Sequence, residues 1–325
     1  KLKTRSIMNE KRVQYVDVGS GILILWVMAF HAMNGSKVFG ATDARVALPF
    51  LTFSMPWFYY KSGLFFKGGR GISGVKKDYK KLIVPFIKWG AVGYAIYLVM
   101  HSISGTLTFE SATWNVLHTF YIYGYIPINT PTWFIISLFF VRIIADYLLT
   151  RPVSPIVYII GGLTIGFVFH LVACPWLPFL IANVAMGIAF FMMGYQLHKY
   201  ETRKWLFTVC LIGYVCFLLF GTSIVGHHRN VLLSGYFLLW PVFAYCGIVV
   251  FNNICRWMAT LFSRFTRPIT FVGENAITLL VSHALIYMPV LHFSTLSSWQ
   301  TVGIIFAGYA AILIILFLFK RNKRV

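Results

Sequence analysis

An aspartate and a histidine stand at two levels of one apolar segment near the start of the chain. Asp17 precedes His31 by fourteen residues, which in an α-helix spans about 21 Å and close to four turns. The two side chains would therefore lie on nearly the same face of a helix. An ionisable side chain inside an apolar membrane span is costly, and by default it marks a candidate functional site.

Both residues admit a structural and a functional interpretation. His31 could serve only to hydrogen-bond a neighbouring helix. It could also be a general base, because an imidazole titrates near neutral pH and can accept a proton from a hydroxyl. Asp17 either neutralises lysines at the inner membrane surface or anchors the helix in a polar cavity below His31. The residue types leave these alternatives open.

The composition predicts an all-α integral membrane protein with a single domain over residues 1–325. Hydrophobic residues make up 59% of the chain and charged residues 11%, whereas soluble proteins carry about 25% charged residues. Apolar runs long enough to cross a bilayer recur along the whole length. The five cysteines form no C-x-x-C pair, and the sequence predicts no metal site.

The net charge of +20 does not indicate a nucleic-acid partner, because the basic residues occur in short clusters between apolar spans. The pattern predicts ten spans in the inner (cytoplasmic) membrane, with both termini cytoplasmic. Residues 102–131 are expected to form an outer excursion with a short interfacial or re-entrant helix. The predicted spans cover residues 14–34, 47–66, 82–101, 132–150, 154–172, 178–198, 205–224, 231–252, 270–291 and 300–319.

Basic residues near the predicted inner face form a candidate anion site. Lys61 follows an aromatic run and precedes Ser62 and Gly63, which permit a helix break or a close helix approach. Its ammonium group could snorkel to the cytoplasm or contact a phosphate or carboxylate in a cavity. The following loop could enforce topology, bind anionic lipid, or bind an anionic cofactor. The candidate cofactor-binding residues are Lys61, Ser62, Lys77, Lys80, Lys81 and Arg142.

Later polar residues complete the candidate set. Trp133 opens the fourth predicted span, where a tryptophan is expected at a membrane interface. In the ninth predicted span, Glu274 and Asn275 lie near the inner side and His283 lies deeper. These residues, together with Ser20, are candidates for contacting or supporting an acceptor substrate.

Taken in order, these stretches resemble the membrane-bound acyltransferase-3 family, whose members O-acylate sugars and other acceptors. The resemblance extends over nearly the whole chain and depends on the ordered set more than on any one motif. It is carried by Asp17…Gly21-Ile22…His31, by Met55-Pro56-Trp57-Phe58-Tyr59-Tyr60-Lys61-Ser62-Gly63-Leu64-Phe65 with the later Lys80-Lys81-Leu82-Ile83-Val84-Pro85, by Pro131-Thr132-Trp133-Phe134-Ile135, and by Gly273-Glu274-Asn275-Ala276…His283.

The resemblance implies an O-acyltransferase, with acetyl-CoA or another acyl-CoA as donor. His31 matches the catalytic histidine. Lys80 and Lys81 match basic residues at the inner mouth, where the nucleotide end of the donor is expected. The acceptor would be a glycan or a similar hydroxyl compound of the cell envelope. Membrane lipid is an expected partner, and a homodimer is an expected assembly.

One position departs from the family pattern. Eleven residues before the histidine the family usually has arginine or lysine, whereas this chain has Ser20. Either a neighbouring cation such as Lys61 or Arg142 takes over, or the cofactor is handled differently, or activity is impaired. The rival function from another class is a transporter or flippase for a glycan or lipid intermediate, which would use Lys61, Arg142 and Glu274 along its pathway.

Overall fold

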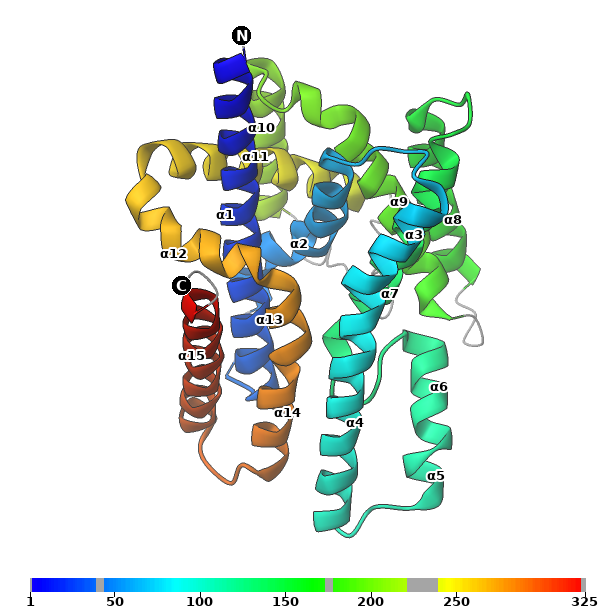
Figure 1. Ribbon diagram of the computed structural model, residues 1–325, viewed down its shortest axis with the longest axis vertical. Coiled ribbons are helices and arrows are strands. Elements are labelled where there is room, and N and C mark those ends of the chain that lie inside the picture. Colours follow the sequence, from blue (N-terminus) through cyan, green and yellow to red (C-terminus); the bar gives the residue numbers. More distant parts are fainter. Residues whose placement is uncertain (1, 39–43, 173–177, 221–238, 323–325) are drawn as a thin grey trace.

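The computed structural model describes residues 2–38, 44–172, 178–220 and 239–322, which form helices and no strand (Figure 1). The all-α prediction is confirmed for this part of the chain. The elements are α1 (Leu2–Gly35), α2 (Ala44–Leu64), α3 (Gly71–Asp78), η1 (Tyr79–Ile83), α4 (Val84–Ile103), α5 (Phe109–Ala112), α6 (Trp114–Tyr123), η2 (Thr130–Thr132), α7 (Trp133–Leu148), α8 (Pro155–Val172), α9 (Phe179–Leu197), η3 (His198–Tyr200), α10 (Lys204–Phe220), α11 (Trp240–Leu261), α12 (Ser263–Glu274), α13 (Ala276–Ser282), α14 (Ala284–Phe293) and α15 (Ser298–Asn322).

Several helices are suited to a bilayer. Within the described residues, seven helical stretches are long and apolar enough to cross a membrane, and α8 and α10 contain shorter apolar stretches. The chain is therefore a multi-pass membrane protein, whereas the count of ten spans and the cytoplasmic position of both termini stay predictions. The seven stretches are Gln14–Gly35, Gly71–Ile103, Thr130–Leu148, Phe179–Tyr200, Trp240–Leu261, Ala276–Phe293 and Ser298–Phe319.

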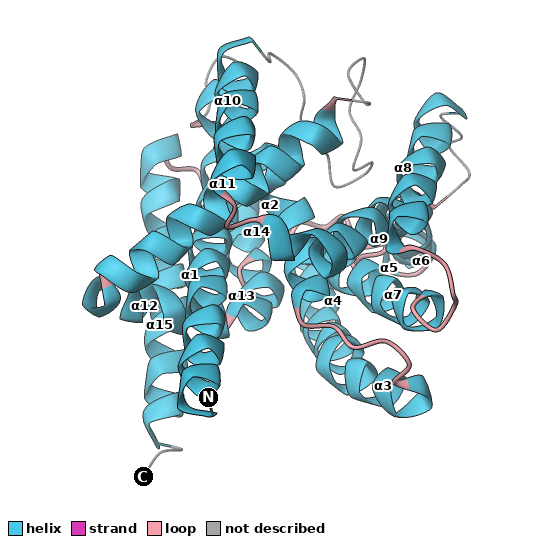
Figure 2. Cartoon of the chain, turned by 90° about the horizontal axis from the view of Figure 1, so that it is seen from above, coloured by secondary structure: helices cyan, strands magenta, loops and turns pink. Residues whose placement is uncertain are grey.

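Helix α2 lies between two groups of helices. Helices α1, α12, α13 and α15 form one group, and α3, α4, α7, α8 and α9 form the other, in both views (Figures 1 and 2). Helix α1 packs against α2, α11, α12, α13, α14 and α15. The short helices α5 and α6 follow α4, where the sequence predicts an excursion and no span.

The end predicted for the eighth span is wrong, and its predicted start at residue 231 lies outside the described residues. The sequence predicts a span over 231–252 with Arg256 in the loop that follows, but α11 covers Trp240–Leu261 and contains Arg256. The helix tolerates this guanidinium because Arg256 pairs with the buried carboxylate of Glu201 and donates to the Tyr15 hydroxyl at 3.0 Å. The predicted outer loop at 227–230 lies outside the described residues.

The predicted ninth span is interrupted at Asn275, between α12 and α13. Asn275 separates α12 from α13; its backbone is not helical (φ −104°, ψ 12°), and its side chain donates to the carbonyl of Phe271 at 2.7 Å. At His283, between α13 and α14, the backbone keeps helical dihedral angles (φ −64°, ψ −34°), and the two helices form one apolar stretch, Ala276–Phe293. Because of the break at Asn275, α12 crosses α1 while α13 and α14 continue beside the second half of α1 (Figure 1).

Glycines allow two pairs of helices to touch at the backbone. A Cβ on Gly63 of α2 would lie 2.0 Å from the carbonyl oxygen of Phe191, and one on Gly194 of α9 would lie 2.1 Å from that of Tyr60. Between α1 and α12, a Cβ on Gly273 would lie 1.8 Å from the carbonyl oxygen of Asp17. The Ser62-Gly63 pair therefore serves a close helix approach, and α2 continues without a break through it.

The α2–α9 contact gives a prediction for stability. We expect Gly63→Ala to lower the free energy of unfolding by about 1–3 kcal/mol, the usual cost of forcing a methyl group into packed atoms. Thermal unfolding of the purified protein in detergent measures the change. Gly161→Ala in α8 is the matched control, because its Cβ would have no neighbour within 4 Å. An equal melting temperature for wild type and Gly63→Ala would contradict the prediction.

A buried carboxylate ties the α9–α10 connection to α2 and α11. Glu201 is 0% exposed and accepts hydrogen bonds from the Tyr60 hydroxyl, from Asn252 at 3.0 Å and from Arg256. Asn252 in turn accepts a hydrogen bond from the Trp57 indole at 2.7 Å. This network fixes the part of α2 that precedes Lys61.

Candidate active site

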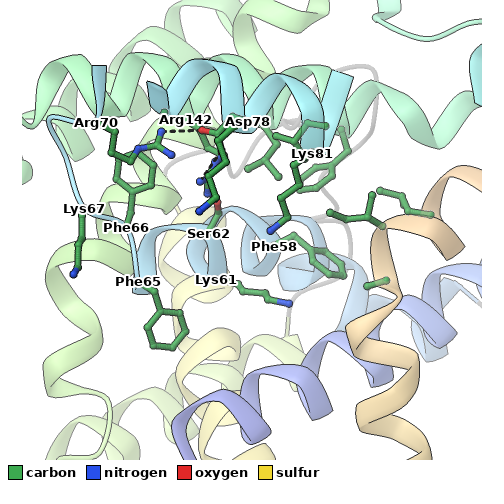
Figure 3. Close-up of a pocket in the computed structure, with 18 of the residues that line it drawn as sticks. Phe58, Lys61, Ser62, Phe65, Phe66, Lys67, Arg70, Asp78, Lys81 and Arg142 are labelled. Carbon is green, nitrogen blue, oxygen red and sulfur yellow. Dashed lines mark hydrogen bonds and ion pairs between the residues drawn. The ribbon is translucent and has the colours of Figure 1, made fainter. Parts of the chain in front are cut away.

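A cavity of about 690 Å³ lies between α1, α2, α3, η1, α7 and α13 (Figure 3). One part of its wall is apolar and another is cationic. The apolar wall includes Ile24, Phe58, Phe134, Leu138, Ile277 and Leu280. The cationic wall consists of Lys61, Lys67, Arg70, Lys77, Lys81 and Arg142.

The two arginines of the cavity are neutralised by two buried aspartates. Asp78 lies 2.8 Å from Arg70 and 3.0 Å from Arg142, and Asp146 lies 3.2 Å from Arg70. The backbone N–H groups of Arg70 and Gly71 also donate to Asp146 at 3.0 Å. Burial alone would lower the pKa of Arg70, but its hydrogen bonds and ion pairs with the two aspartates raise it above its ordinary value. These pairs join the start of α3 to α7.

The lysines of the cavity carry further positive charge. The ion pairs that neutralise the two arginines do not involve them. Lys67, Lys77 and Lys81 are exposed, whereas Lys61 is half-buried. Figure 3 shows Lys61 and Lys81 reaching into the space between α2 and η1. Beyond the neutralised arginines, the cavity therefore offers an anion the charges of three exposed lysines and of Lys61, which Asp17 partly offsets.

The helical phase separates the predicted lysines of this region. Lys77 and Lys81 are four residues apart and share the face that lines the cavity, whereas Lys80 is exposed and outside its lining. Ser62 lines the cavity as predicted, and its hydroxyl accepts a hydrogen bond from Arg142 at 2.8 Å. Lys67 and Arg70 complete the site without having been singled out individually from the sequence.

Lys61 contacts the residue that departs from the family pattern. Its ammonium group donates to the hydroxyl of Ser20, which itself donates to the carbonyl of Val16 at 2.7 Å. Asp17 lies near enough to act electrostatically on Lys61. The structure thus places the ammonium of Lys61 beside α1 at Ser20, while Arg142 lies against Ser62 and Asp78.

A cluster of aromatic and imidazole rings surrounds His31. The His31 ring is half-buried, lies parallel to the Tyr287 ring with centroids 5.6 Å apart, and lies 5.5 Å from the His283 ring. The Tyr287 hydroxyl is 3.2 Å from the hydroxyl of Thr130 in η2. Tyr287 and Thr130 were not predicted, although Tyr287 follows His283 by one helical turn and that spacing could have indicated it.

The cavity and the His31 cluster lie at successive levels of the same helices. Ile24 lines the cavity and precedes His31 by seven residues, and Leu280 precedes Tyr287 by seven. Seven residues are about two turns, or roughly 10 Å, and return to nearly the same helix face. His31 therefore stands about two turns beyond the apolar wall of the cavity.

Four other predicted residues lie away from the cavity wall. Asp17 is half-buried on α1, and the chain between it and His31 is helical, so the two do not meet. Trp133 is buried at the start of α7, beside Phe134, which lines the cavity. Glu274 is exposed at the end of α12, and Asn275 caps that end. None of these four residues lines the cavity.

A family model described as an acyltransferase domain, acyltransferase 3, matches residues 13–321. No curated protein and no solved structure matches the chain. The matched range contains the cavity, the His31 cluster and every helix described above except the first turns of α1 and the last residue of α15.

Proposed function

Because the chain belongs to the acyltransferase-3 family, we propose that this membrane acyltransferase moves an acetyl group from cytoplasmic acetyl-CoA to a hydroxyl acceptor at the outer face. The acceptor is a glycan or a similar compound of the cell envelope, and the protein resides in the cytoplasmic membrane. The observation that carries the proposal is the cavity, which joins a lysine-rich wall to an apolar wall two turns from His31.

The donor fits the two kinds of wall. The nucleotide end of coenzyme A carries phosphates, which lysines bind as point charges, and Lys67, Lys77 and Lys81 are exposed where they line the cavity. The pantetheine arm would extend along the apolar side chains of Phe58, Phe134 and Leu280. This orientation places the thioester toward the level of His31.

The chemistry requires one base. His31 takes the proton from the acceptor hydroxyl, and the resulting oxygen nucleophile attacks the thioester carbonyl. The new C–O bond forms, the C–S bond breaks, and the proton passes from His31 to the departing sulfur, which leaves as the free thiol. The imidazole ends the cycle in the form in which it began.

Donor binding separates this proposal from a glycan or lipid transporter. We expect acetyl-CoA and free coenzyme A to raise the melting temperature of the purified protein, because a ligand at one hundred times its Kd stabilises the folded state by about 2.7 kcal/mol. Pantetheine is the control and should stabilise the protein less, since it lacks the nucleotide and its phosphates. A protein that gains no stability from either nucleotide and transfers no labelled acetyl group to glycans would contradict the proposal.

A further inference from the structure

A second histidine lies behind His31 and has no exposed surface. The His283 side chain is 0% exposed, and its ring lies 5.5 Å from His31, 5.8 Å from Tyr287 and 6.3 Å from Tyr309. His31 itself is half-buried. His283 therefore has no surface open to a substrate, whereas His31 has some.

The hydrogen bond of His283 determines which of its nitrogens carries the proton. Its Nδ1 lies 2.9 Å from the carbonyl oxygen of Leu279. A carbonyl oxygen can only accept, so Nδ1 bears the hydrogen and Nε2 of the neutral ring presents a lone pair. This backbone contact holds both the tautomer and the ring orientation, as a carboxylate does for a catalytic histidine.

The lone pair of His283 lacks a donor. Its Nε2 is buried, and no hydrogen-bond partner exists for it within the residues that the structure describes. Buried polar atoms are nearly always satisfied, so an orphaned acceptor beside a reactive ring calls for an explanation. The ring centroids of His31 and His283 lie 5.5 Å apart, so a hydrogen bond between the two imidazoles needs only a small side-chain rotation or one bridging water.

We propose that His283 is a positioning residue whose Nε2 accepts the N–H of His31, directly or through one water. The inference rests on the proposed acyl transfer. It leaves the other nitrogen of His31 unprotonated and directed at the acceptor hydroxyl. After His31 takes the hydroxyl proton, Nε2 of His283 still holds the opposite N–H, and the proton leaves to the thiolate sulfur. His283 gains and loses no proton.

The surroundings of His283 supply few competing groups. The titratable side chains that face it are His31 of α1, Tyr287 of α14 and Tyr309 of α15. The hydroxyl of Tyr287 is engaged with Thr130, whereas that of Tyr309 is buried without a partner in the described chain. Among the described titratable groups around His283, Tyr309 is therefore the competing donor that the test must address.

The experiment compares His283→Leu, His283→Gln and Tyr309→Phe with wild type. Release of the coenzyme A thiol from acetyl-CoA, with water as the surrogate acceptor, is measured across pH. We expect His283→Leu to lower kcat about 10- to 100-fold, as when a residue orienting a functional histidine is lost. The acidic limb of its pH–rate profile should move to lower pH, because the protonated His31 loses its acceptor, with KM for acetyl-CoA unchanged. His283→Gln keeps an acceptor and should restore most of the rate, and Tyr309→Phe should resemble wild type.

A second readout does not depend on turnover. In ¹⁵N spectra of histidine-labelled protein, the His31 signal, identified by its loss in His31→Ala, should report one tautomer in wild type and a mixture in His283→Leu. A wild-type rate, pH profile and tautomer in His283→Leu would overturn the inference while the acyltransferase stands. Equal losses in both His283 variants, or a Tyr309→Phe profile matching His283→Leu, would also overturn it. Absence of turnover and of acetyl-CoA binding in wild type would instead overturn the proposed function, and the spectra would still decide the contact.

Discussion

Replacing His31 by alanine is expected to reduce acyl transfer by about 10²- to 10⁴-fold, the usual contribution of a general base. The reason is the position of the ring, which is half-buried beside Tyr287 and about two turns beyond the apolar wall of the cavity. No histidine other than His31 and His283 occurs in this ring cluster in the described structure. Transfer of labelled acetyl from acetyl-CoA to envelope glycans measures the effect.

The interpretation of that loss requires intact folding and donor binding. His31 is not among the residues that line the cavity. The variant His31→Ala should therefore keep the wild-type affinity for coenzyme A and a wild-type melting temperature. His198→Ala is the matched control, because His198 lies in η3, bonded to the carbonyl of Gly194 at 2.7 Å and away from the cavity. Full transfer by His31→Ala would assign His31 a packing role and remove the proposed base.

The parts of the fold that follow from local apolar runs could be predicted. The first predicted span, 14–34, lies inside α1, and the last, 300–319, lies inside α15. The end of the eighth span is misplaced because Arg256 indicates a loop by its charge alone, and its partner Glu201 comes from a distant segment. The break in the ninth span is not predictable because nothing in the sequence shows that the Asn275 side chain bonds the preceding turn.

The candidate site was predictable in residue type and less so in geometry. The sequence singled out His31, Lys61, Ser62, Lys77 and Lys81, all of which lie in the cavity wall or the ring cluster. It could not distinguish Lys80 from its neighbours without the helical phase. It also could not show which cations are already paired, because Asp78 and Asp146 reach the arginines through tertiary packing.

Replacing Lys61 by methionine is expected to weaken acetyl-CoA binding about 10- to 150-fold, the factor equivalent to the ~1.5–3 kcal/mol of a hydrogen bond to a charged group. Lys61 is the least exposed of the four lysines that line the cavity, so solvent screens its charge least. Methionine preserves the apolar stem and removes the ammonium. Isothermal titration calorimetry measures the affinity, and Lys80→Met, exposed and outside the cavity wall, should leave it within about twofold.

An exchange of side chains tests why Ser20 is tolerated in this chain. Because the Lys61 ammonium already contacts the Ser20 hydroxyl, the double variant Ser20→Lys with Lys61→Ser moves the cation to α1, where the family usually carries it, without moving the charge far in space. We expect this variant to recover most of the affinity that Lys61→Met loses, whereas Lys61→Ser alone should remain weak. Recovery would show that the cation was relocated between two helices. A normal affinity in Lys61→Met would show instead that donor binding depends on the exposed lysines. A double variant as weak as Lys61→Ser would show that a cation at position 20 does not replace Lys61, and that Ser20 reflects a different handling of the cofactor.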